Sequence, residues 1–282
     1  MKRIVAATLS IVLALMLFGC AKKDNEIVGR SSTIAYAETT SDIAKAEIDG
    51  EYTFAFNPYV VSREAINAMK GNEHYNKFVS AVLNRASAVS VPTREEYDNI
   101  RFAIGEYFPF ASLVENFRYS AIDMAVLIDY KYDLEEHNKK ISDFKTEIEN
   151  VFAQCVDRKD SNIIAAISLY NWISKNIAVA TSIQSNDTAS SGIAQTETLP
   201  DISSANDIYS TLLTKKGNEK SASALYVFLL KQLGIDSKVV SGWSGEVFRT
   251  WNMVCLNNKW YHCDIYSEQK ASDGEGLIYF GM

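Results

Sequence analysis

Three charged side chains stand where elements of the second half of the chain are expected to begin or end. Glu219 follows Gly217-Asn218 at the start of a long apolar segment, Arg249 opens an alternating segment, and Asp264 closes the next one. Acyl transfer by a cysteine needs a nucleophile at a helix N-terminus, a base on one strand and an orienting carboxylate on the next. The positions suit that chemistry, but a carboxylate and a guanidinium stand where a thiol and an imidazole are required.

The elements that would position these residues follow from their periodicity. Lys220–Leu233 has the apolar period of a helix, and Gly234 is the residue type that commonly ends one. Lys238–Ser241 and the alternating segment led by Arg249 predict strands. Asn257-Asn258 is a turn that should return the chain as a further strand, Trp260–Asp264. A helix packed on an antiparallel hairpin is therefore expected.

The cysteines after residue 20 are Cys155, Cys255 and Cys263. A two-residue turn at 257–258 would place Cys255 opposite Trp260 and Cys263 opposite Asn252. The two strand cysteines are then not directly opposed, so a disulfide between them is not expected. Neither pair has metal-ligand spacing. We interpret all three as buried structural thiols and predict no metal site and no cofactor.

Other polar residues near the predicted site offer little alternative chemistry. Ser221 lies two residues past Glu219 and should point about 200° around the helix, away from the site. Ser223 faces the site but has no base beside it. His262, the one histidine nearby in sequence, should share a strand face with Asp264. A serine paired with His262 is therefore a weak candidate.

Several segments, in order along the chain, resemble the transglutaminase-like superfamily, which has a papain-like fold. They are Leu169–Ile177, Gly217–Glu219, Leu233–Ile235, Val239–Gly242, Trp251-Asn252 and Trp260–Asp264. The resemblance covers roughly residues 162–282 and implies an α+β fold with a central helix packed on an antiparallel sheet. Matched to the family's cysteine, histidine and aspartate, the triad positions hold Glu219, Arg249 and Asp264. The resemblance thus implies a degenerate triad and a pseudoenzyme.

Two interpretations of the three residues remain open. The cluster could only join the helix to the sheet, with Arg249 bridging Glu219 and Asp264. Alternatively, an exposed Arg249 could capture a carboxylate or phosphate. Trp243, Trp251 and Trp260 flank the site, either packing on the sheet or lining a cleft. The binding candidates are Arg249, Trp243, Trp251 and His262. An enzyme with altered chemistry is the alternative function.

The first twenty residues predict a targeting segment. Lys2-Arg3 precedes the apolar run Ile4–Phe18, and Leu17–Cys20 resembles the bacterial lipobox. That resemblance implies cleavage before Cys20 and a lipid on its sulfur, which would hold the chain on the extracytoplasmic face of a membrane. An ordinary secretory signal or a single span is the alternative. Loss of Lys2 and Arg3 would take the net charge from −7 to −9.

The remaining chain divides by pattern into a polar tether at 20–50, a helical region at 51–160 and the transglutaminase-like part at 161–282, after the signal peptide at 1–19. A short helix is expected after Ser62, and apolar stripes predict further helices up to Cys155, including one through residues 113–132. His74 and His137 lie among charges and are expected at the surface. The polar segment Thr181–Asn206 predicts a long loop.

Composition limits the function. Apolar residues make up 47% of the chain and charged residues 22%, as in globular proteins. The net charge of −7 and the lack of a basic cluster exclude nucleic acid as an expected partner. We predict a lipid-anchored binding or scaffolding module for a peptide, protein or cell-wall ligand. That ligand class is an analogy with the substrates of the family.

Overall fold

The computed structural model describes residues 46–48, 51–53, 56–60, 73–157, 159–180, 207–271 and 280–281. The predicted signal peptide with Cys20, most of the predicted tether, the helix expected after Ser62 and the segment 181–206 lie outside these residues. β1 (Ala46–Ile48) pairs antiparallel with β2 (Glu51–Thr53). The last part of the range assigned to the tether therefore contains a strand.

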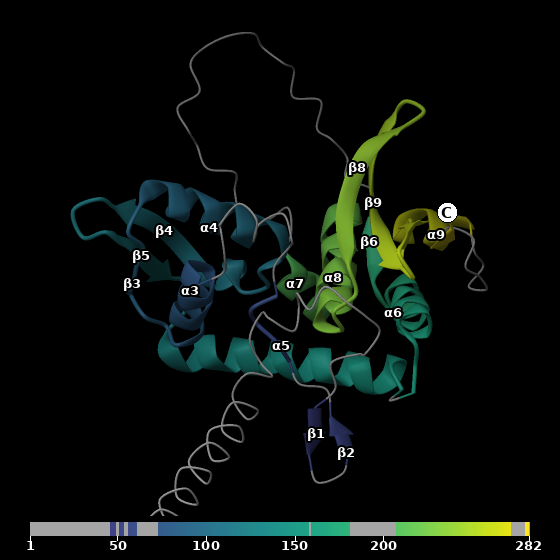
Figure 1. Ribbon diagram of the computed structural model, residues 1–282, viewed down its shortest axis with the longest axis horizontal. Helices are drawn as coiled ribbons and strands as arrows, with labels where there is room; N and C mark the ends of the chain where they lie inside the picture. The colour runs from purple at the N-terminus through teal and green to yellow at the C-terminus, as the bar shows by residue number, and fades with distance from the viewer. Residues whose placement is uncertain are drawn as a thin grey trace, which may run out of the picture.

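The N-terminal region combines two helices with a small antiparallel sheet (Figure 1). The helices are α3 (Glu73–Leu83) and α4 (Arg94–Tyr107), as their apolar stripes predicted. Thr93 caps α4 in a capping box with Glu96, whose side chain returns to the backbone N–H of Thr93. The sheet has the order β3-β5-β4, with β3 at Ala88–Ser90, β4 at Val114–Ser120 and β5 at Ala125–Tyr130; the 3₁₀ turn η2 is Ala111–Leu113.

The helix predicted through residues 113–132 is wrong, because this segment is the hairpin β4–β5. Its widely spaced apolar residues matched a helical stripe, but Val126 and Ile128 alternate into the core as strand residues do. A turn separates the strands, with the Ser120 hydroxyl donating to Asp123 at 2.6 Å and Met124 at a φ of 48°. Pairing between the two strands therefore determines the structure of this segment, although the spacing of its apolar residues matches a helix.

His137 is not a surface residue, contrary to the prediction. It lies in α5 (Leu134–Cys155) and is completely buried. Its Nε2 is 2.8 Å from the carbonyl oxygen of Val82, and its ring packs edge-on against Tyr130 at 5.1 Å. Burial lowers the pKa of His137. His74 is partly exposed and pairs with Glu96 at 3.1 Å.

Helix α8 (Glu219–Gln232) forms the centre of the molecule. Apolar residues around its whole circumference are buried, as expected of a helix enclosed by other elements; they include Leu225, Tyr226, Val227, Phe228, Leu229 and Leu230. Gly234 follows the C-cap Leu233, and its φ of 71° allows the Ile235 N–H to reach back to the Leu230 carbonyl. The predicted central helix is confirmed, and its end follows from one glycine.

An antiparallel sheet packs on α8, in the order β11-β10-β9-β8. Its strands are β8 (Ser237–Ser244), β9 (Val247–Leu256), β10 (Lys259–Cys263) and β11 (Phe280–Gly281). Asn257 and Asn258 both take positive φ in the turn, as a type I′ hairpin requires. The predicted register is confirmed, with Trp260 opposite Cys255 and Cys263 opposite Asn252. The expected α+β class is also confirmed.

Five further elements complete the arrangement. Figure 1 shows the long helix α5 running beneath both halves, with α6 and α9 beside the sheet. α6 (Asn162–Asn176) begins after the N-cap Ser161. The others are α7 (Ile208–Thr214), α9 (Ile265–Ala271), and the parallel pair β6 (Ala178–Ala180) and β7 (Lys216–Asn218). Within the described part of the chain, no helix is long and apolar enough to span a bilayer.

Candidate functional site

The start of α8 is fixed by its own side chains. Asn218 accepts a hydrogen bond from the backbone N–H of Ser221 at 2.8 Å, and the Ser221 hydroxyl accepts one from the backbone N–H of Asn218 at 3.0 Å. This capping box makes Asn218 the N-cap of α8. It also commits the Ser221 hydroxyl to the helix end, in agreement with the prediction that Ser221 does not serve the site.

Gly217 allows β7 to pass close to its neighbours just before the helix. A Cβ at this position would lie 2.5 Å from the Ser221 hydroxyl oxygen and 2.8 Å from the Thr211 hydroxyl oxygen. Both distances are shorter than real Cβ contacts. Glycine is therefore needed here to bring Glu219 into place at the first turn of α8.

Glu219 and Arg249 form the centre of the site. The Arg249 Nε lies 3.0 Å from each carboxylate oxygen of Glu219. The backbone N–H of Thr250 donates to the same carboxylate at 3.1 Å. Glu219 also lies at the N-terminal end of α8, where the helix dipole favours negative charge. Its carboxylate is thus held by one guanidinium, one backbone donor and the helix end.

Asp264 holds the other end of the guanidinium. The Arg249 Nη2 is 3.3 Å from both Asp264 carboxylate oxygens and 3.3 Å from the Ser267 hydroxyl oxygen. Asp264 in turn accepts from the backbone N–H of Ser267 at 2.9 Å and from its hydroxyl at 2.7 Å. The Tyr266 ring lies 4.5 Å from the guanidinium carbon. We call Glu219, Arg249 and Asp264, with Ser267, the ion-pair cluster.

The ion-pair cluster is largely withdrawn from water. The exposed fraction of the side chain is 1% for Glu219, 14% for Arg249 and 21% for Asp264. Two carboxylates and one guanidinium carry a formal charge of −1. Because Arg249 is already engaged by both carboxylates, capture of a further anion by its guanidinium is disfavoured. The geometry favours the interpretation in which the cluster joins helix to sheet.

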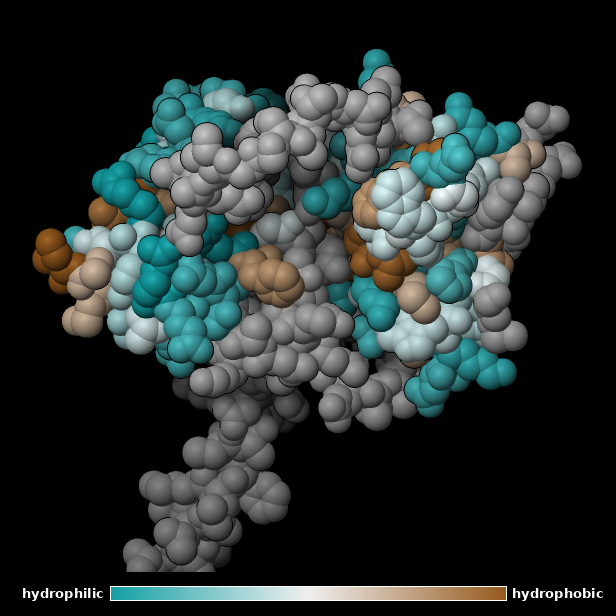
Figure 2. Space-filling model, turned by 90° about the horizontal axis from the view of Figure 1, so that it is seen from above, coloured by the Kyte–Doolittle hydropathy of each residue, from teal (hydrophilic) through white to brown (hydrophobic). Residues whose placement is uncertain are grey.

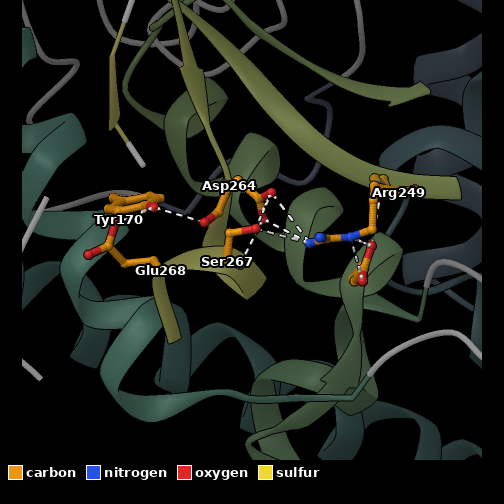
Figure 3. A network of polar contacts seen from close by, with 7 residues as sticks. Tyr170, Arg249, Asp264, Ser267 and Glu268 are labelled. Carbon is orange, nitrogen blue, oxygen red and sulfur yellow. Dashed lines mark hydrogen bonds and ion pairs between the residues drawn. The ribbon is translucent and has the colours of Figure 1, made fainter. Parts of the chain in front are cut away.

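A second polar layer lies behind Asp264. The Tyr170 hydroxyl is 3.0 Å from the Asp264 backbone carbonyl oxygen and 3.1 Å from the Glu268 carboxylate (Figure 3). Glu268 is 1% exposed. Burial, together with the nearby Glu268 charge, raises the pKa of Tyr170. Tyr170 from α6 therefore fixes the end of β10 and the start of α9, and with them Asp264.

The other predicted site residues lie apart from this cluster. The Trp251 indole donates to the His262 Nδ1 at 2.8 Å, and His262 is exposed. Trp243 is 70% exposed near the end of the β8–β9 hairpin, where it packs edge-on against Phe248 at 5.4 Å. The Lys238 ammonium lies 4.9 Å from the Trp260 ring. These contacts belong to the sheet, in line with the packing interpretation of the tryptophans.

The thiols of Cys263 and Cys155 are poor nucleophiles. Cys263 is fully buried, and burial raises the pKa of its thiol. Cys155 is a half-buried thiol on α5 whose pKa burial raises to about 11. Half-burial at Cys155 and Cys255 corrects the expectation that all three cysteines are buried. Among the residues that the structure describes, no group of three His, Cys, Asp or Glu side chains could hold a metal ion.

Sequence reasoning missed three residues of the site. Ser267 and Tyr266 contact Arg249, and the backbone of Thr250 contacts Glu219. The spacing of Asp264 and Ser267, a carboxylate three residues before a hydroxyl at a helix start, is a signal that could have identified Ser267. No comparable pattern points to Tyr266.

A sequence model described as the transglutaminase-like superfamily matches residues 149–265. The match begins inside α5, ahead of the boundary expected at residue 161. The resemblance found in the segments from Leu169 to Asp264 is thereby confirmed. No curated protein matches the chain.

Two solved structures share a limited likeness with the chain. One is a candidate cysteine protease from Cytophaga hutchinsonii, with 13% identity and a TM-score of 0.31, over 48% of this chain and 40% of that one. The other is described as a TGase, with 16% identity and a TM-score of 0.33, over 52% of this chain and 34% of that one. The chain thus spans less than half of either structure, and the family assignment rests on the sequence match.

Proposed function

We propose that the chain is a catalytically inactive member of the transglutaminase-like superfamily, whose sequence model matches residues 149–265. In this proposal Glu219 and Arg249 replace the nucleophile and the base of the family, while Asp264 keeps the carboxylate. The chain then acts as a binding or scaffolding module, anchored by a lipid on Cys20 at the extracytoplasmic face of a membrane.

The contact between Glu219 and Arg249 is the observation that carries this proposal. A carboxylate is a much weaker acyl nucleophile than a thiolate. A guanidinium stays protonated in proteins and offers only hydrogen-bond donors, so Arg249 cannot accept a proton as a base does. The two groups neutralise one another at 3.0 Å instead of facing a substrate. Loss of even one member of a catalytic triad costs orders of magnitude in rate.

The described neighbours offer no replacement for the missing groups. The Ser221 hydroxyl serves the helix cap, and Ser223 is 2% exposed. Burial holds Cys263 in its thiol form by raising its pKa. His262 accepts the Trp251 indole proton on Nδ1 and belongs to the sheet. These contacts favour inactivity over an enzyme with altered catalytic residues.

An acyl-transfer assay tests the inactivity directly. We expect the full chain to show no transglutaminase or peptidase turnover above the rate without protein. Turnover by the wild-type chain that disappears in Glu219→Ala but persists in the exposed-site control Glu135→Ala would refute the proposal. Replacement of both residues, Glu219→Cys with Arg249→His, should create a thiol that reacts with iodoacetamide faster than the thiol of Glu219→Cys with Arg249→Met, which has no charged or basic group in place of Arg249.

The anchor needs a separate test, because Cys20 lies outside the described residues. The lipobox resemblance of Leu17–Cys20 supports it. We expect a clickable fatty-acid analogue, fed to a bacterium that produces the chain, to label the wild-type protein. Cys20→Ser should abolish both the labelling of the protein and its recovery in the membrane fraction. A labelled Cys20→Ser variant would refute the assignment.

A further inference from the structure

The β8–β9 hairpin presents a long sheet edge. β8 is the outermost strand of the four-stranded sheet, and its residues from Ser237 to Ser244 pair with β9 in unbroken register. Figure 1 shows the hairpin extending well beyond the end of α8. Gly245 takes a φ of 62° as the first of its two turn residues. The edge is therefore eight residues long and free of any bulge.

The hydrogen-bond pattern shows which backbone groups point outward. The Cys255 N–H donates to the Asp236 carbonyl at 2.8 Å, so these two residues form a bonded pair. Bonded and non-bonded pairs alternate along an antiparallel ladder. The N–H and C=O groups of Val239, Ser241 and Trp243 consequently face away from β9. Among the described residues, none donates to or accepts from these three outward backbone groups.

Natural sheet edges are usually blunted by proline, lysine, a bulge or a covering element. β8 contains no proline. Its one lysine, Lys238, extends across a face of the sheet to the Trp260 ring of β10 and does not cover the outer edge of β8. In the part of the chain that the structure describes, the main neighbours of β8 are β9 and α8. Within the described residues, β8 therefore has neither a paired strand nor a proline or bulge on its outer edge.

Exposed apolar side chains lie beside the β8 edge at the end of the hairpin. The exposed fractions are 70% for Trp243, 52% for Val247 and 39% for Phe248. In Figure 2, which looks down on this end, brown and pale surface gathers in the right half, where Figure 1 places the hairpin. A partner lying along β8 would therefore meet both backbone hydrogen bonds and an aromatic contact.

We propose that the β8 edge binds an extended peptide segment of a partner protein, which adds to the sheet as a further strand beside Val239, Ser241 and Trp243. Only an extended backbone offers donors and acceptors at this alternating spacing. The chain's net charge of −7 favours a neutral or basic peptide over a second acidic copy. This proposal rests on the proposed function in one respect, that the chain works by binding.

Hydrogen exchange followed by NMR tests the proposal on the full ¹⁵N-labelled chain. The probe is a short synthetic peptide of alternating threonine and valine with lysine at both ends. In the free chain, the outward amides of Val239, Ser241 and Trp243 should exchange fast and the inward amides of Val240 and Gly242 slowly. The peptide should protect the outward amides. The same peptide with methylated backbone nitrogens on its bonding edge should not.

Two variants at one position separate the edge from its side chains. Ser241→Pro removes one outward donor without touching the ladder to β9, as proline is tolerated on strand edges. Ser241→Ala loses the same hydroxyl contact to Thr250, 3.0 Å away, but keeps the donor. We expect about tenfold weaker peptide binding for the proline variant. The alanine variant should bind as the wild type does, and thermal unfolding checks that both are folded.

Other outcomes would overturn the proposal. Outward amides that are already protected in the free monomer would mean that the chain covers its own edge. If protection of the outward amides appears together with a dimer in analytical ultracentrifugation, the edge binds a second copy of the chain. Equal binding of the methylated peptide would mean that contact is through side chains only. None of these results depends on turnover, so failure here is distinct from failure of the inactive-site proposal.

Discussion

Replacement of Arg249 by methionine should destabilise the chain far more than a surface charge substitution does. The change leaves the Glu219 carboxylate, 1% exposed, without its guanidinium partner at 3.0 Å. Removing one partner of a buried ion pair costs about 3–5 kcal/mol. Glu219 keeps the Thr250 N–H and the helix end, so we expect the lower end of that range, about 3 kcal/mol.

Glu219→Gln should cost less. The amide keeps an acceptor for the Thr250 N–H, and Arg249 keeps Asp264 and Ser267, which lie nearer to solvent. We expect a loss of about 1–2 kcal/mol. In the double variant the lone buried charge disappears, so its cost should fall short of the sum of the single costs by about 2 kcal/mol. That difference is the coupling between the two side chains.

Urea unfolding followed by tryptophan fluorescence gives these free energies by linear extrapolation. Arg118→Met is the matched control, because Arg118 pairs with Asp129 at 3.4 Å while both side chains are more than half exposed. It should cost less than about 0.5 kcal/mol. If Arg249→Met costs no more than Arg118→Met, or the two site substitutions are simply additive, the buried ion-pair cluster is refuted.

Two glycines and one histidine offer further checks. Gly217→Ala should cost about 1–3 kcal/mol of unfolding free energy through overpacking, whereas Gly105→Ala, where a Cβ meets nothing within 4 Å, should gain about 0.5–1 kcal/mol; equal effects would contradict the close approach at Gly217. Because burial lowers the pKa of His137, its contribution to stability is complete above the ordinary pKa of about 6.5 and is lost as the pH falls through it. Wild-type stability should therefore drop more than that of His137→Gln as the pH falls from 7.5 to 5.5; parallel pH profiles would rule this out.

The C-terminal half was predictable because its signals are local. The pair Asn257-Asn258 fixes the turn and hence the register of two strands, and Asn218 and Gly234 mark the two ends of α8. The resemblance to the transglutaminase-like superfamily then implied that Glu219 and Arg249 lie at neighbouring positions. Their opposite charges predicted that Arg249 would pair with Glu219 and Asp264.

The N-terminal half was less predictable for two physical reasons. The hairpin β4–β5 has an apolar spacing that matches a helix, and only pairing between distant residues decides against it. His137 was judged by its charged neighbours, although it lies one turn before Ile141 and two before Phe144, on the same apolar stripe. Extending the apolar stripe from Ile141 towards the N-terminus of α5 would have placed His137 in the core.

The aromatic packing around Phe228 has a consequence for how the chain unfolds. Phe228 of α8 lies 6.3 Å from Phe56 and 5.9 Å from Phe144, both outside the family match. Gln232 and Asn57 exchange two hydrogen bonds, at 2.9 and 2.8 Å. The N-terminal region therefore completes the core of the family segment. A fragment cut at residue 149 would expose this aromatic surface, and the two regions should melt as one cooperative unit.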